Sequence, residues 1–336
     1  MKRVGLIYNP ISGPRVGRRL AYIEAAAQVL REAGIEVQWA ETYGPGSGGA
    51  QARSMAHDGC DTIFACGGDG TIHDVLQGLI SSPAALAIIP LGTANALAHD
   101  LGIPRSPAAA ARAALHGRPH RIPVGKATFN DTSGGPSSRY FTVAFGAGAD
   151  AHLFYRLDST WKRRHGMKAY YAQALQLWLT HDLPRFQVEF TDARGDLCQA
   201  VTSQVLAVRI SDFGGVLRNL APGAALSRPD LRVVLFKTGS RLPYLMYVTR
   251  TLLDARWPVP GVELVSTSRL VCRPLADNGP QRIYAETDGE LLSRLPVEVS
   301  IVPDALTLVV PQTFATEEVR EHRMATTLPP VSDPVS

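Results

Sequence analysis

Three glycines and an aspartate stand between a short apolar run and a helical pattern. Gly67, Gly68 and Gly70 can take positive φ and leave no side chain between the backbone and a ligand. A glycine turn at a helix start presents free N–H groups and the positive end of the helix dipole, which suits phosphate. Asp69 would be destabilising in an apolar turn unless it is hydrogen-bonded or close to a metal or nucleotide. The turn predicts a phosphate site, although a purely structural glycine turn has the same composition.

The residues on either side predict the elements that position this turn. Thr62 to Cys66 are apolar or β-branched, as in a parallel strand buried on both faces. Thr71 can cap the following helix, whose apolar residues recur at helical spacing: Ile72, Val75, Leu76, Leu79 and Ile80. Strand and helix patterns alternate over residues 1–121, which predicts a parallel α/β sheet with helices on its faces. The expected strands are 3–8, 35–42, 62–66 and 86–90, and the expected helices include 16–33, 50–57 and 107–116.

Two further turns follow strands of the same predicted sheet. Asn9-Pro10-Ile11-Ser12-Gly13 follows the first strand, and Leu91-Gly92-Thr93-Ala94-Asn95 follows the fourth. Ligands of parallel α/β sheets bind beyond the carboxyl ends of the strands. All three turns are therefore expected at one edge of the sheet.

From Ile122 onward strand-like runs dominate, which predicts an antiparallel β-rich second domain over residues 122–304. We expect single strands at 140–145 and 201–210 in this region. Apolar helices are expected at 168–181, after the basic run Lys162-Arg163-Arg164, and at 241–256. The polar, proline-containing segment 317–336 is expected to be disordered.

A second acidic motif, Asp288-Gly289-Glu290, lies far along the chain. Its carboxylates share one face if the segment is extended, although Gly289 can bend it and break that relation. Two nearby carboxylates can bind Mg²⁺, or one can act as a general base while the other orients it. A solvated acidic turn is the alternative.

Composition excludes some classes of function. The 336 residues are 45% hydrophobic and carry a net charge of +4, which is too weakly basic for a nucleic-acid partner but compatible with anionic ligands or membranes. The four cysteines are scattered without metal-binding spacing, so a reduced, cytoplasmic chain is expected. No apolar run approaches the roughly 20 residues of a spanning helix.

The three turns, read as Asn9–Gly13, Gly67–Thr71 and Pro90–Asn95, together with Asp288-Gly289-Glu290, resemble the catalytic domain family of diacylglycerol kinases, sphingosine kinases and related bacterial lipid kinases. The similarity runs from about Arg3 to Val310. NAD kinases and phosphofructokinases share the Gly-Gly-Asp-Gly core, whereas the Pro-Leu-Gly-Thr-x-Asn element and the segment 162–170 look like the lipid branch.

The resemblance implies ATP- and Mg²⁺-dependent phosphorylation of a lipid hydroxyl, with diacylglycerol or a related glycerolipid as acceptor. The implied fold is an α/β nucleotide domain (1–121) followed by a β-sandwich (122–304), with the site in the cleft between them and a strand at 305–311 that returns to the first domain. Asp288 would accept the hydroxyl proton, with Glu290 beside it. The residues implied around the nucleotide are Asn9, Pro10, Ser12, Gly13, Thr42, Gly67, Gly68, Asp69, Gly70, Thr71, His73, Thr93 and Asn95.

The chain departs from the family pattern in one acidic segment. Some members hold a structural Mg²⁺ with an acidic pair after an Ala-Pro element, where this sequence has Arg228-Pro229. Asp230 is a displaced candidate ligand, and the arginine argues against the metal. Asp150 is implied to face the substrate head group, although a turn aspartate that bonds its own backbone is the alternative. His152 stands where sphingosine kinases are more acidic, which favours a neutral glycerolipid.

A lipid kinase takes its substrate from an anionic leaflet, where each nearby basic residue contributes about 1 kcal/mol. The run Lys162-Arg163-Arg164 and the apolar helix 241–256, which ends at Trp257, are candidates for transient contact with that membrane surface. A solvated face and core packing are the respective alternatives. The main prediction is a cytoplasmic, peripherally membrane-associated lipid kinase. A kinase of a soluble small molecule that uses the same ATP site, or a catalytically silent lipid- or nucleotide-binding protein, stays open, as does a homodimer.

Overall fold

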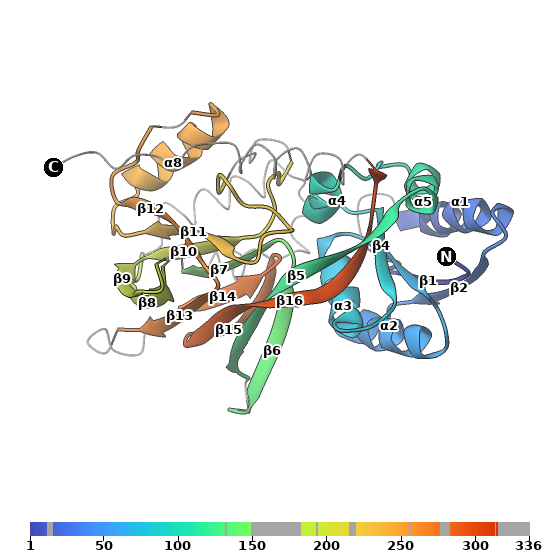
Figure 1. The fold of residues 1–336 in the computed structure, drawn as a ribbon, viewed down its shortest axis with the longest axis horizontal. Coiled ribbons are helices and arrows are strands. Elements are labelled where there is room, and N and C mark those ends of the chain that lie inside the picture. Colours follow the sequence, from blue (N-terminus) through green and yellow to red (C-terminus); the bar gives the residue numbers. More distant parts are fainter. Residues whose placement is uncertain are drawn as a thin grey trace.

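The computed structural model describes residues 1–11, 16–131, 133–148, 183–192, 194–214, 220–255, 257–275, 283–312 and 314 (Figure 1). The predicted basic run 162–164, the helix 168–181 and the segment 317–336 lie outside these residues. No described helix is both long enough and apolar enough to cross a lipid bilayer.

The first domain is the predicted parallel α/β sheet, with strands in the order β2-β1-β3-β4. Its strands are β1 (Arg3–Tyr8), β2 (Glu36–Glu41), β3 (Thr62–Gly67) and β4 (Ala85–Pro90). Its helices are η1 (Val16–Arg18), α1 (Arg19–Glu32), α2 (Ser47–His57), α3 (Asp69–Leu79), α4 (Ala96–Asp100) and α5 (Pro107–Leu115).

Alternation along β3 divides the core of this domain into two layers. Every residue of β3 is buried, as a strand covered on both faces requires. Ile63 and Ala65 pack in the cluster formed with α2 and α3, whereas Phe64 and Cys66 pack with α1 and α5. Figure 1 shows the two helix pairs on opposite sides of the sheet. The carboxyl ends of all four parallel strands lie at one edge of the sheet.

The second domain is an antiparallel β-sandwich. One of its layers is a six-stranded sheet in the order β12-β11-β10-β7-β14-β15. These strands are β7 (Ala144–Gly148), β10 (Gln204–Val208), β11 (Leu231–Phe236), β12 (Val262–Thr267), β14 (Tyr284–Thr287) and β15 (Glu290–Arg294). Helix α8 (Leu242–Leu252) connects β11 to β12.

The other layer continues the sheet of the first domain. It contains β5 (Arg118–Asn130), β6 (Pro136–Phe141), β8 (Phe186–Thr191), β9 (Leu197–Thr202), β13 (Arg269–Pro274) and β16 (Val297–Val310). The long strand β16 pairs with β13 in the sandwich and reaches β4 of the first domain, where Leu308 is aligned in parallel with Leu86. Its pairing with β5 shifts register between Val302 and Leu306, and Asp304 there has a φ of 46°. The two domains therefore share one continuous sheet.

Two expected strands are each divided in the structure. The run 140–145 breaks at Thr142 and Val143, because their N–H groups are donated to a carboxylate instead of a neighbouring strand. The run 201–210 breaks at Ser203, where the chain passes from β9 in one sheet to β10 in the other. Ser203 is fully buried and its hydroxyl donates to the carbonyl oxygens of Phe236 and Thr238. Both breaks depend on contacts with residues distant in the sequence.

Candidate active site

The predicted turns do meet at the carboxyl edge of the parallel sheet. Asn9 follows β1, where its side-chain oxygen accepts a hydrogen bond from the N–H of Ile11 at 3.0 Å. Thr42 follows β2 and donates its N–H to the Tyr8 carbonyl at 2.9 Å. The Gly67 carbonyl at the end of β3 accepts from the N–H groups of Leu91 and Gly92. Of the implied nucleotide residues, Ser12 and Gly13 lie outside the described residues, as does Asp150.

Close packing leaves no room for a side chain at Gly67 and Gly92. Gly67, Gly68 and Gly70 do not use the positive φ that glycine allows. A Cβ on Gly67 would lie 2.5 Å from Cβ of Thr71, and a Cβ on Gly70 would lie 2.5 Å from Oε1 of Glu290. A Cβ on Gly92 would overlap the backbone of Gly68. The turns are thus packed against one another and, through Gly70, against the second domain.

Asp69 ties two of the turns together. Its carboxylate accepts the N–H of Asn95 at 2.8 Å and that of Ala96 at 2.7 Å, which satisfies the first turn of α4. Burial raises the pKa of the Asp69 carboxyl, the two amide bonds lower it, and the charge of Asp288 raises it again. The aspartate is therefore hydrogen-bonded, which is one of the two outcomes expected from its position in an apolar turn.

Asp288 is the residue around which the second domain organises its side of the site. It occupies the turn between β14 and β15 with a φ of 51°, a left-handed conformation that Asp and Asn enter more readily than other non-glycine residues. Its Oδ1 accepts from the N–H groups of Val143 and Ala144 at 2.9 and 3.1 Å, and its Oδ2 from that of Thr142 at 3.1 Å. Only 3% of its side chain is exposed.

Helix α3 contacts this turn directly. Nδ1 of His73 lies 3.2 Å from Oδ2 of Asp288, and the His73 side chain is also buried. One turn of helix later, Gln77 donates to the Tyr140 carbonyl at 2.8 Å and accepts the Tyr140 N–H at 3.0 Å. These two side chains fix α3 against the strand break and the acidic turn of the second domain.

Glu290 is the open carboxylate of the site. Gly289 has a φ of 82°, so the chain turns and the two acidic side chains do not share one extended face. Glu290 is exposed, and within the described part of the chain its carboxylate has no hydrogen-bond partner. Desolvation where it faces the Gly70 turn raises the pKa of Glu290; the charges of Asp74 and Asp288 raise it too, and His73 lowers it.

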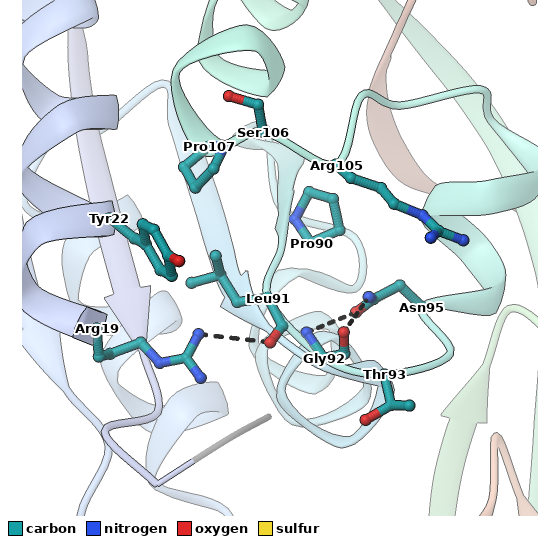
Figure 2. A pocket seen from close by; sticks show the side chains of 10 residues that line it. All are labelled: Arg19, Tyr22, Pro90, Leu91, Gly92, Thr93, Asn95, Arg105, Ser106 and Pro107. Carbon is teal, nitrogen blue, oxygen red and sulfur yellow. Dashed lines mark hydrogen bonds between the residues drawn. The ribbon is translucent and has the colours of Figure 1, made fainter. Parts of the chain in front are cut away.

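A cavity of about 480 Å³ opens beside the Gly92 turn. Figure 2 shows Arg19 and Tyr22 of α1 on one side and Asn95 and Arg105 on the other. Only 4% of Arg19 is exposed, its Nη1 is 3.5 Å from the Leu91 carbonyl, and its Nε and Nη2 have no partner among the described residues. Burial lowers the pKa of this guanidinium. A buried cation with unused donors suits an anionic ligand.

Sequence reasoning missed both arginines of this cavity. Arg19 is the first residue of α1, and Arg105 precedes the Ser106-Pro107 start of α5. Their positions beside turn residues were the available signal. Thr93 and Asn95, which also line this cavity, are among the residues that the resemblance implies around the nucleotide.

The acidic residues fit Mg²⁺ only as a partner of a nucleotide. The described residues contain no group of three or more His, Cys, Asp or Glu side chains placed to hold a metal ion. Mg²⁺ is usually held by one or two carboxylates together with substrate phosphates. Glu290, open and surrounded by other negative charges, is the side chain that fits such a role.

Asp230 does not fit a structural metal site. Its two carboxylate oxygens accept from Nε and Nη2 of Arg228 at 2.7 and 2.6 Å. Beside this pair, the guanidinium of Arg209 is fully buried and donates to four backbone carbonyls, those of Pro123, Leu226, Arg228 and Asp230. Burial lowers the pKa of Arg209 to about 10, so the group remains a cation at neutral pH. An arginine therefore supplies the positive charge at this turn.

Comparison with known proteins agrees with the two-domain fold. A family model described as the diacylglycerol kinase catalytic domain matches residues 3–127, and one described as the YegS C-terminal NAD kinase beta sandwich-like domain matches residues 143–310. A diacylglycerol kinase of Bacillus subtilis (strain 168) is 27% identical over 89% of this chain and 93% of its own length. One from Staphylococcus saprophyticus is 28% identical over 96% and 99%. A crystal structure from Bacillus anthracis str. Sterne superposes with a TM-score of 0.71 at 20% identity, covering 93% of this chain and 98% of the other.

Proposed function

This chain belongs to the diacylglycerol kinase catalytic domain family, and we propose that it transfers the γ-phosphate of ATP to a lipid hydroxyl. The acceptor that we propose is diacylglycerol or a related glycerolipid. Support for it comes from the two bacterial relatives named diacylglycerol kinase, which match nearly the full length of the chain.

The observation that carries this proposal is the contact between the glycine turn of one domain and the acidic turn of the other. Gly70 abuts Glu290, and His73 in the following helical turn reaches Asp288. Phosphoryl transfer needs positioned phosphates and a group near the attacking hydroxyl rather than covalent help from the protein. A phosphate held at the Gly67–Thr71 turn would lie beside these carboxylates, so the transferred group and the proton acceptor would be neighbours.

The nucleotide phosphates are proposed to extend from the Gly67–Thr71 turn toward the cavity beside Gly92. Arg19, whose buried donors are unused, and Arg105 would offset their charge. Thr93 and Asn95 line the same cavity. Mg²⁺ bound with the nucleotide would neutralise part of the phosphate charge, and Glu290 is the protein carboxylate placed to contact it.

The hydroxyl proton is proposed to pass to the acidic turn. The resemblance assigns this role to Asp288, whose carboxylate also holds three backbone N–H groups and the His73 ring. Glu290 has open oxygens and a raised pKa, which suits proton uptake or a metal contact. Replacement of each carboxylate separately distinguishes a chemical role from a positioning role.

Transfer of label from ATP tests the proposal. The purified protein is incubated with γ-labelled ATP, Mg²⁺ and a total lipid extract, and label is counted in the organic and aqueous phases. We expect label in the organic phase, and its loss in Glu290→Gln and Asp288→Asn variants that remain folded. Label confined to an aqueous product would indicate a kinase of a soluble substrate, and binding of ATP or lipid without any transfer would indicate a silent binding protein.

A further inference from the structure

Helix α8 has its aliphatic side chains on the outside. They are Leu242, Leu245, Val248, Leu252 and Leu253, which are 62, 50, 43, 51 and 65% exposed. Trp257, four residues after the last of them, is 40% exposed. A surface helix of a soluble protein normally shows the reverse arrangement, with aliphatic residues against the core. Figure 1 shows α8 at the end of the molecule remote from α1 and α5.

Polar aromatic residues fix the inner face of α8, so this orientation is built in. Tyr244 stacks on Phe236 with ring centroids 4.2 Å apart, and its hydroxyl lies 2.9 Å from Oγ of Ser203. The Tyr247 hydroxyl donates to the Leu220 carbonyl at 2.6 Å, and burial raises the pKa of Tyr247 to about 12. Rotation of the helix to bury its leucines would break each of these contacts.

The charges on this helix have one sign. Arg241 precedes its first turn and Arg250 lies in its last turn, where the guanidinium is 4.3 Å from the centre of the Tyr247 ring. No acidic residue occurs between Arg241 and Leu253; Asp254 follows directly, and with Arg256 the stretch from Arg241 to Trp257 carries three arginines and one aspartate. Aliphatic residues flanked by arginine and tryptophan are the composition of helices that lie in the interface of an anionic bilayer.

We propose that the outer face of α8, defined by the five aliphatic residues above, docks on an anionic lipid bilayer. The aliphatic side chains would enter the boundary between head groups and acyl chains, to a depth of about 5–10 Å, and Arg241 and Trp257 would lie at head-group level. The inference deepens the proposed function, because a kinase with a lipid acceptor must work at a membrane surface.

Vesicle binding measured without ATP tests this surface separately from catalysis. Wild-type protein is sedimented with vesicles of phosphatidylcholine containing phosphatidylglycerol and with phosphatidylcholine alone. We expect binding to the anionic vesicles and a loss of at least tenfold in the partition coefficient for Leu245→Glu/Leu252→Glu. The matched control is Leu197→Ser, which changes a 70% exposed leucine on β9 and should bind like wild type.

Two further readouts keep the outcomes distinct. The double variant should show the wild-type unfolding temperature and phosphorylate detergent-dispersed lipid at the wild-type rate, because these residues are remote from the acidic turn. Vesicle binding equal to wild type in the double variant would overturn the proposed membrane contact of α8. If the double variant also changed from dimer to monomer while it still bound vesicles, the face would be an interface with a second copy. Binding through α8 without lipid phosphorylation would leave the surface standing and overturn the proposed function.

Discussion

Nδ1 of His73 and Oδ2 of Asp288 lie 3.2 Å apart, although 215 residues separate them in the sequence. The histidine belongs to the helix that begins at the glycine turn, and the aspartate to the turn between β14 and β15. Both side chains are nearly buried. This contact aligns the proposed phosphate turn with the proposed proton acceptor.

The two carboxylates of the acidic turn should respond differently to amide substitution. In Asp288→Asn, an NH₂ group replaces one of the two oxygens that accept three backbone N–H groups, so at least one of these buried donors loses its partner, which costs about 1–3 kcal/mol. We therefore expect a lower free energy of unfolding together with a loss of activity. Glu290→Gln should change stability by no more than about 0.5 kcal/mol and lower kcat by about 10²–10⁴-fold. Urea unfolding and initial rates measure the two effects, and full activity in Glu290→Gln would remove Glu290 from the chemical step.

The pH dependence of activity should follow the neighbours of Glu290. Its pKa is raised above the ordinary 4.5, so activity that needs the ionised carboxylate should fall on the acidic side at a pH above that value. Asp74 raises this pKa and His73 lowers it. Asp74→Asn should therefore move the acidic limb to lower pH, and His73→Gln should move it to higher pH. If the acidic side of the pH–activity profile were the same in the wild type and both variants, Glu290 would not be the group that titrates.

The same shift has a stability consequence of definite sign. A carboxyl whose pKa is raised on folding stabilises the protein below its unfolded pKa, and this contribution is lost as pH rises through the folded pKa. For Glu290 the window begins near 4.5 and extends upward. Glu290→Gln should flatten the fall in unfolding free energy across this window, as measured by urea titrations at successive pH values. An unchanged slope would show that Glu290 does not titrate differently in the folded state.

We expect Arg19 to increase the affinity for ATP and to lower the stability of the free protein. Removal of a buried cation with unused donors relieves a desolvation penalty, so Arg19→Met should keep or raise the unfolding temperature of the free protein. The same change should raise KM for ATP by about 10–100-fold, the equivalent of a charge-assisted hydrogen bond of about 1.5–3 kcal/mol. Arg18→Met, at an exposed neighbouring position, is the control and should leave KM unchanged. A wild-type KM in Arg19→Met would place the phosphates elsewhere.

Because Arg209 holds the carbonyl groups around the 226–230 turn, the stability of this turn should not depend on divalent cations. Arg209→Met leaves four carbonyls without their donor and should lower the free energy of unfolding by at least about 3 kcal/mol. Arg228→Lys, at a half-exposed position, should cost about 1 kcal/mol or less. The unfolding temperature of the nucleotide-free wild type should be the same in EDTA and in Mg²⁺. A drop in EDTA would indicate that the turn holds a metal after all.

Local sequence patterns predicted the first domain well because each of its strands, turns and helices shows in a run of consecutive residues. The buried run 62–66, the glycine turn and the apolar stripe of α3 each show in consecutive residues, and parallel alternation then places the turns at one edge. The strand break at Thr142 could not be predicted in this way, since it exists because Asp288, 146 residues away, accepts that N–H. The role of Arg209 depends likewise on the Pro123 carbonyl, 86 residues away. The strand break at Thr142 and the role of Arg209, which exist only through distant partners, could therefore not be predicted from local patterns.

The irregular pairing of β16 with β5 bears on how the two domains can move. Both strands run without interruption from the sandwich into the first domain, so a flexible linker does not join the domains along this sheet. The register shift between Val302 and Leu306 is the point at which these strands depart from regular pairing. Pro123, opposite this shift, is held through its carbonyl by Arg209. Any relative motion of the domains would have to bend this strand pair, and the bond from Arg209 ties β5 to the sandwich at the irregular point.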